Sequence, residues 1–146
     1  MSLIHSSSPD QTEALGARIG GQLIAGDLLV LSGELGSGKT TFVRGLVRGM
    51  AIDAHVSSPT FQLMRTYQTG MRRLVHVDAY RLQPGDLDSL GIEEQLSDAA
   101  VVAEWGEHLG LDQWPESGLI RFHHLDLGRA IEVVRLGGRL AEVVGP

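Results

Sequence analysis

A lysine at the end of a glycine-rich run is the residue of this sequence best placed to do chemistry. Residues 33–40 read GELGSGKT and match the pattern G-x-x-x-x-G-K-[ST] at every fixed position. In such a loop the glycines let backbone N–H groups point at a polyphosphate, Lys39 adds positive charge, and the Thr40 hydroxyl can bind Mg²⁺. The run predicts a P-loop (residues 33–40) that binds nucleotide phosphates; the alternative is a plain glycine-rich turn.

The surroundings of this P-loop favour nucleotide binding. An apolar run at residues 28–31 precedes it, as expected for a strand buried on both faces, and residues 41–50 follow with apolar side chains at helical spacing. Lys39 is also the only lysine, because eleven of the 12 basic residues are arginine. A compact ammonium group suits a narrow phosphate loop better than the planar fork of arginine does.

Two acidic residues follow short apolar runs. Asp78 comes after LVHV at residues 74–77, and Glu104 comes after VVA at residues 101–103. In P-loop proteins an acidic residue beside the phosphates helps to hold Mg²⁺, which prefers oxygen ligands and keeps several waters. We predict this role for Asp78, and for Glu104 the role of a second carboxylate that binds the metal or positions water. A turn aspartate and a solvated glutamate are the alternatives.

Two further polar segments each allow a functional and a structural interpretation, and a third argues against a metal site. Residues 57–61 (SSPTF) predict either a switch loop that senses the γ-phosphate or a simple turn. His76 lies two residues before Asp78 on the same strand face, so it is either a partner of the site or a buried core histidine. His123 and His124 face opposite sides of a predicted strand, which argues against a shared metal site.

The apolar spacing predicts the elements that must position these residues. Ser8 and Pro9 suit the start of a helix that continues through an apolar stripe to residue 23. A further helix is predicted at 84–97, and strands at 61–67, 72–78, 99–103, 119–124, 131–136 and 140–144. Strands alternate with helices early and follow one another late, which predicts one α/β domain of 146 residues whose mixed sheet ends in an antiparallel edge.

Composition excludes several classes of protein. The net charge of −6 argues against a stand-alone nucleic-acid binder, which would carry an excess of basic residues. The absence of cysteine excludes disulfides and thiolate sites. No apolar run is long enough to span a membrane, and the first residues do not resemble an export signal, so we expect a cytoplasmic protein without membrane contact.

Missing motifs narrow the choice among P-loop proteins. The chain has no asparagine, which excludes the N-K-x-D motif of GTPases, and no L-S-G-G-Q stretch of ABC-type transport ATPases. A small-molecule kinase stays open, although no lid-sized insertion carries the arginines that such kinases place over the phosphates. Arginines available for that purpose are Arg65, Arg72, Arg73 and Arg81.

Four motifs together resemble a known family. Residues 33–42 (GELGSGKTTF), 58–61 (SPTF) and 76–82 (HVDAYRL), followed by Glu104-Trp105, occur in the order and spacing of the TsaE family. This family comprises small bacterial ATPases of tRNA threonylcarbamoyladenosine (t6A) synthesis. The resemblance covers nearly the whole chain, and one departure is Ala79, where the family usually has a larger apolar residue.

The resemblance implies a fold and a set of site residues. The fold would be that of P-loop NTPases, with a mixed, mostly parallel sheet of about seven strands flanked by helices. Asp78, Glu104 and Thr60 would be catalytic, and Thr40 and Glu104 would hold Mg²⁺. ATP or ADP would be bound by Gln11, Thr12, Leu35, Gly36, Ser37, Gly38, Lys39, Thr40, Thr41, Trp105 and Arg129, of which Gln11, Thr12 and Arg129 would touch the adenosine.

The resemblance also implies partners. TsaE-like proteins act with TsaD and TsaB, where ATP hydrolysis resets the complex and another component transfers the threonylcarbamoyl group. We therefore expect a weak, partner-dependent ATPase that meets tRNA only through that complex, a role that agrees with the acidic net charge. A small-molecule kinase and a nucleotide-dependent regulatory scaffold without turnover are the alternatives.

Overall fold

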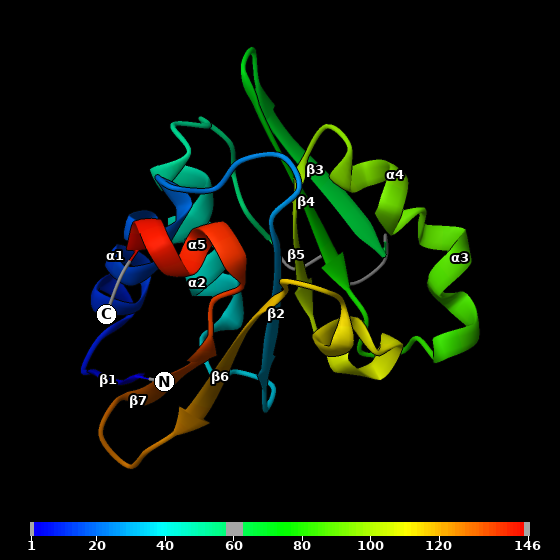
Figure 1. Cartoon of the computed structure of the whole chain (residues 1–146). Coiled ribbons are helices and arrows are strands. Elements are labelled where there is room, and N and C mark those ends of the chain that lie inside the picture. Colours follow the sequence, from blue (N-terminus) through cyan, green and yellow to red (C-terminus); the bar gives the residue numbers. More distant parts are fainter. Residues whose placement is uncertain (1, 58–62, 145–146) are drawn as a thin grey trace.

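The computed structural model describes residues 2–57 and 63–144, in which helices cover both faces of one sheet (Figure 1). The strands are β1 (Ser2–Ser6), β2 (Leu28–Gly33), β3 (Met64–Thr69), β4 (Arg72–Asp78), β5 (Ala100–Glu104), β6 (Gly118–His124) and β7 (Arg129–Arg135). The helices are α1 (Pro9–Gly20), α2 (Lys39–Gly49), α3 (Leu87–Leu90), α4 (Ile92–Leu96) and α5 (Gly138–Val144), with 3₁₀ turns η1 (Pro84–Asp86), η2 (Gly106–Leu109) and η3 (Leu111–Gln113).

The seven strands lie in the order β1-β7-β6-β2-β5-β4-β3. β2 runs parallel to β6 on one side and to β5 on the other, and β5 runs parallel to β4. β7 and β3 run in the opposite direction, and β1 is antiparallel to β7, so five of the seven strands point the same way. The prediction of a P-loop fold with a mixed, mostly parallel sheet is confirmed.

One predicted strand is wrong. Residues 140–144 belong to helix α5, and the outermost strand is instead β1, which pairs with the free edge of β7. A short apolar run does not by itself distinguish a strand from a buried helix. Because β1 already occupies the edge of the sheet, the chain turns at Gly137 after β7, and α5 buries Leu140 against the sheet and the α1–α2 pair.

The predicted helix at 84–97 is present as two short helices. α3 and α4 meet at Gly91, which has a φ of +60° and so turns the chain between them. Figure 1 shows both on the face of the sheet opposite α1, α2 and α5. An apolar core lies on each face: one contains residues of α1 and α2, and the other contains residues of α3 and α4.

Close packing of α1 against α2 fixes the helix that follows the P-loop. α1 begins as predicted, with the Ser8 hydroxyl accepting a hydrogen bond from the Gln11 N–H at 3.2 Å. A Cβ atom at Gly16 would lie 2.3 Å from the Phe42 carbonyl oxygen, and one at Gly45 would lie 2.1 Å from the carbonyl oxygen of Glu13. Only glycine allows the two backbones to approach this closely, so α1 and α2 form a tightly packed pair on one face of the sheet.

Candidate nucleotide and metal site

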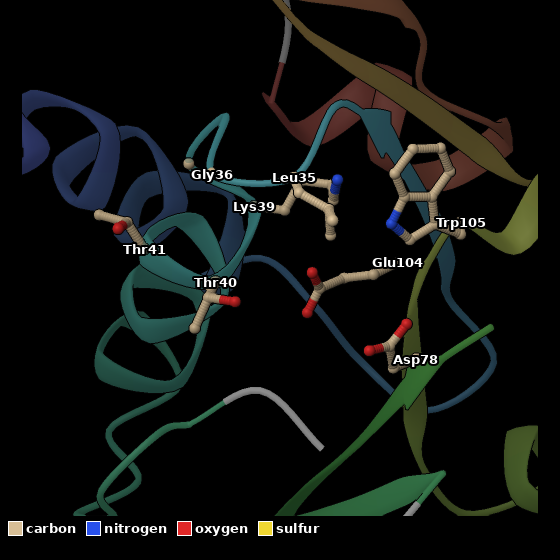
Figure 2. A pocket seen from close by; sticks show the side chains of 9 residues that line it. Leu35, Gly36, Lys39, Thr40, Thr41, Asp78, Glu104 and Trp105 are labelled. Carbon is tan, nitrogen blue, oxygen red and sulfur yellow. The ribbon is translucent and has the colours of Figure 1, made fainter. Parts of the chain in front are cut away.

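The P-loop lies where the central parallel strands end. β2 leads into the loop, Glu104 pairs in register with Leu31 of β2, and Asp78 pairs with Glu104 across β4 and β5. A cavity of about 310 Å³, here named the strand-end cavity, opens beside the loop (Figure 2). It is lined by Leu35, Gly36, Gly38, Lys39, Thr40, Thr41, Asp78, Glu104 and Trp105. The structure therefore brings most of the predicted site residues together.

The P-loop backbone leaves the first turn of α2 open toward this cavity. Gly38 precedes the helix with a φ of +107° and offers no side chain to cap it, so the N–H groups at the start of the helix can bind an anion. A Cβ atom at Gly33 would lie 2.5 Å from the carbonyl oxygen of Phe122, which explains the glycine at the start of the loop. The loop has the geometry of an anion-binding helix start.

Lys39 is held inside the loop with little access to water. It is 4% exposed, and its ammonium group donates hydrogen bonds to the carbonyl oxygens of Gly33 and Glu34 and lies 4.2 Å from the ring centroid of Trp105. Burial lowers the pKa of Lys39 from its ordinary 10.5, and the charges of Glu104, Glu107 and Asp78 oppose this shift. A cation that water solvates poorly gains from a nearby anion.

Asp78 and Glu104 each have one oxygen engaged. Oδ1 of Asp78 accepts a hydrogen bond from the Tyr80 N–H at 3.0 Å, and Oε2 of Glu104 lies 2.5 Å from Nε2 of His76. The second oxygen of each carboxylate has no hydrogen-bond donor among the residues that the structure describes. Figure 2 shows both carboxylates and the Thr40 hydroxyl turned toward the same space.

These three side chains suit a cation that is held jointly with phosphate. Within the described part of the chain no group of three or more His, Cys, Asp or Glu residues could hold a metal ion by itself. Mg²⁺ is usually bound by one or two carboxylates together with substrate phosphates and waters, whereas a dedicated protein site would need more ligands. The donor set of Thr40, Asp78 and Glu104 therefore fits Mg²⁺ only beside a phosphate group.

A second cavity of about 270 Å³, here named the N-terminal cavity, adjoins the first. It is lined by Ser6, Ser7, Ser8, Pro9, Thr12, Gly36, Gly38, Thr41, Gly128 and Arg129, so it shares three P-loop-side residues with the strand-end cavity. Arg129 donates hydrogen bonds from Nη2 to the Gly36 carbonyl oxygen at 3.3 Å and from Nη1 to that of Gly128 at 2.8 Å. The Thr12 hydroxyl is buried and bonded to that of Ser6 at 2.7 Å.

Of the remaining predicted residues the structure describes two, Gln11 and Ser37, and neither lines either of these cavities. Gln11 does not line either cavity; its Oε1 accepts a hydrogen bond from the Ser7 N–H at 2.8 Å and so supports the start of α1. Ser37 is 1% exposed, and its hydroxyl has no partner within the described residues. Thr60, with the rest of residues 58–62 of the predicted switch loop, lies outside the described residues.

His123 and His124 have different neighbours, in agreement with the prediction that they do not share a metal site. Nε2 of His123 lies 3.3 Å from Oε1 of Glu132, whereas Nε2 of His124 lies 3.3 Å from the carbonyl oxygen of Leu35. For His76 both interpretations hold at once, because it is fully buried and also bonded to Glu104 rather than to Asp78.

Two aromatic neighbours of Trp105 had no role in the sequence prediction. The ring centroids of Tyr80 and His108 lie 5.2 and 5.3 Å from that of Trp105, which itself adopts a left-handed backbone with φ of 59°. Tyr80 lies in the HVDAYRL motif, and its position near Asp78 was the one available signal. Nothing in the sequence marks His108. The three rings pack against one another, and the ring of Trp105 lies against the Lys39 ammonium.

Comparison with known proteins identifies relatives over most of the chain. The profile of the family described as "Threonylcarbamoyl adenosine biosynthesis protein TsaE" matches residues 6–133. A Mycobacterium bovis protein named tRNA threonylcarbamoyladenosine biosynthesis protein TsaE is 44% identical over 110 residues, which cover 68% of this chain and 66% of the relative. A Streptomyces coelicolor protein of the same name is 48% identical over 97 residues, or 64% and 66% of the two chains.

This chain thus spans just under two thirds of the length of those two relatives, 66% in each case. A Bacillus subtilis protein with the same name is 36% identical over 113 residues, which cover 77% of this chain and 70% of the relative. Within residues 2–57 and 63–144 every helix is too short or too polar to cross a membrane.

The fold has a solved counterpart. The crystal structure of Bacillus subtilis YdiB superposes on this chain with a TM-score of 0.77 and 29% sequence identity, covering 98% of this chain and 93% of YdiB. The family profile includes the P-loop and both strand-end acids, Asp78 and Glu104, within its residues 6–133. Because the profile extends over residues 6–133, this chain belongs to the TsaE family.

Proposed function

We propose that this chain binds ATP together with Mg²⁺ and hydrolyses it to ADP and phosphate, as a component of tRNA threonylcarbamoyladenosine (t6A) biosynthesis. The observation that carries the proposal is the register of β4 and β5, which sets Asp78 directly beside Glu104 at the edge of the P-loop. A strand-to-helix turn that served only the fold would have no need of two carboxylates beside a buried lysine.

The two cavities divide the nucleotide between them. In the strand-end cavity the P-loop N–H groups and the ammonium of Lys39 would bind the phosphates. In the N-terminal cavity Thr12 and Arg129 would contact the adenosine, with Gly36 and Thr41 at the junction. The residues that the two cavities share support this division, because one extended ligand could pass from one cavity to the other.

Hydrolysis needs a water molecule in line with the γ-phosphate and compensation of the charge that develops on it. Thr40 and Glu104 would hold Mg²⁺, which when bound neutralises charge on the β- and γ-phosphate oxygens. The free oxygen of Asp78 would accept a hydrogen bond from a water molecule and orient it. The first oxygen is fixed by the Tyr80 N–H, so the carboxylate cannot rotate freely.

The partners are part of the proposal. Relatives of TsaD and TsaB would accelerate turnover, and tRNA would be met only through that complex, without membrane contact. The names of the curated relatives support a place in this pathway. The net charge of −6 supports contact with tRNA through proteins rather than through this chain alone.

The test is a measurement of phosphate release from ATP by the purified chain, alone and with TsaB and TsaD. We expect slow, Mg²⁺-dependent release that partners accelerate. Binding of ATP without any release under partner saturation would indicate a regulatory scaffold. Appearance of the γ-phosphate on a metabolite would indicate a small-molecule kinase, and absence of ATP binding would refute all three.

A further inference from the structure

We propose that His76 is a positioning residue that holds the carboxylate of Glu104 in the orientation in which it binds Mg²⁺. The inference rests on the proposed function, because it takes Glu104 as a ligand of the metal. It assigns a specific task to the histidine of β4, which touches neither the nucleotide cavities nor solvent.

The contact is short and enclosed. His76 lies in β4, between the edge strand β3 and β5, with Arg65 of β3 and Val102 of β5 as its cross-strand neighbours. Its Nε2 atom lies 2.5 Å from Oε2 of Glu104, and the two side chains are 0% and 6% exposed. Because a carboxylate accepts hydrogen bonds, Nε2 carries the hydrogen in this contact.

The hydrogen bond selects one orientation of Glu104. A glutamate has three rotatable side-chain bonds, and a buried carboxylate without a partner is unfavourable. With Oε2 fixed by His76, the other oxygen, Oε1, is left for the strand-end cavity, which Glu104 lines together with Thr40 and Asp78. Partners behind a metal ligand typically change metal affinity about 10–100-fold when they are removed.

Stability alone does not explain this histidine. Its second ring nitrogen, Nδ1, is buried and has no hydrogen-bond partner among the described residues. The neighbouring positions on the same face of the sheet include Leu74 and Val102, both buried in the core on the α1–α2 side. An apolar residue at position 76 would avoid the unpaired nitrogen, so the imidazole is explained by its contact with Glu104.

The experiment compares ADP binding with Mg²⁺ and with excess EDTA, by calorimetry, in the full chain and three variants. In His76→Gln the side-chain amide reaches roughly as far as Nε2, so the hydrogen bond to Glu104 is retained. In His76→Leu the donor is lost while apolar volume is kept. Leu74→Ala is the matched control, because it damages the same buried face two residues away without touching Glu104.

We expect Mg²⁺ to tighten ADP binding in the wild-type chain and in His76→Gln and Leu74→Ala. In His76→Leu we expect the factor by which Mg²⁺ tightens ADP binding to be about tenfold smaller than in the wild-type chain. ADP affinity in EDTA should stay unchanged. An unchanged gain in His76→Leu would overturn the proposal, and so would an equal loss with and without Mg²⁺ or the same loss in Leu74→Ala, since these indicate a structural role.

Two results separate this inference from the proposed function. Failure of the wild-type chain to bind ADP at all would refute both. Mg²⁺-dependent ADP binding that is the same in His76→Leu as in the wild-type chain would refute the positioning role alone. Should His76→Leu fail to fold, nitrogen NMR of the wild-type imidazole provides the decision. A hydrogen on Nε2 supports the proposal, and an Nε2 without hydrogen contradicts it.

Discussion

The two cavities that meet at the P-loop are built in different ways. The strand-end cavity is lined by side chains that the sheet register brings together, with charge on Lys39, Asp78 and Glu104. The N-terminal cavity is lined by serines, glycines and Thr12 around the end of β1, with Arg129 as its charged residue. Central parallel strands thus contribute two carboxylates to one cavity, whereas the sheet edge gives the other a largely neutral surface.

This difference leads to a distinct expectation for each cavity. Substitutions in the strand-end cavity should weaken nucleotide binding more when the ligand carries more phosphates and when Mg²⁺ is present. Substitutions in the N-terminal cavity should weaken ATP, ADP and AMP by a similar factor. The predictions below test this contrast, beginning with the largest expected effect.

The largest effect is expected for hydrolysis in Asp78→Asn. Loss of the carboxylate removes the group proposed to orient water, so the rate should fall about 10²–10³-fold, while ATP affinity changes less than about threefold. Single-turnover phosphate release and calorimetry measure the two quantities. A comparable loss in both would show that Asp78 acts in ground-state binding, as Lys39 does.

Lys39→Ala should weaken ATP binding by at least about a hundredfold, or ~2.7 kcal/mol, because the phosphates lose their buried cation. AMP should be affected least. Titration of the three nucleotides against the variant checks the order, and Lys39→Arg should fail to restore affinity because its guanidinium does not fit the same carbonyl cage. Equal losses for ATP and AMP would contradict the assignment of this cavity to phosphates.

Arg129→Ala should weaken ATP, ADP and AMP alike, by about fivefold, which corresponds to ~1 kcal/mol. The guanidinium lines the N-terminal cavity and also bonds the Gly36 carbonyl oxygen, so part of the effect is a looser junction between the cavities. Competition binding with the three nucleotides is the measurement. A loss that grows with the number of phosphates would instead place Arg129 with the strand-end cavity.

The smallest effect concerns Tyr67, which is buried but lines neither cavity. Burial raises the pKa of Tyr67 above its ordinary 10.0. The unfolded chain then loses the phenol proton first, so this contribution is constant below pH 10.0 and lowers the free energy of unfolding as the pH rises above that value. Urea unfolding across this range should show a shallower fall for Tyr67→Phe, without altered nucleotide affinity.

The strand-end cavity was far more predictable from the sequence than the N-terminal one. The P-loop is a local sequence pattern. Asp78 and Glu104 could be predicted from their positions at the ends of two apolar runs, because parallel strands end at a common edge. The register that pairs these two acids, and the contact of Glu104 with His76, depend on which strands lie side by side. That information is distributed over the whole chain.

One edge of the sheet, that of β1, escaped prediction for the same reason. The SLIHS segment of β1 is too short to show alternation, and it becomes a strand because β7 offers a free edge. The run at residues 140–144 has the composition of a strand, but β1 already pairs with the outer side of β7, and the run folds as part of α5. The packing of the Tyr80 and His108 rings against Trp105 likewise depends on tertiary structure, which the spacing of residues in the sequence does not reveal.

The single lysine of this chain has a practical consequence. Because Lys39 carries the only ε-amino group in the sequence, isotopic labelling of lysine would give one ammonium resonance, and that resonance would come from the P-loop. Its position over the Trp105 ring predicts an upfield ring-current shift that disappears when the ammonium leaves the ring for a phosphate. One atom, observed without any substitution, would therefore follow nucleotide binding and release during turnover.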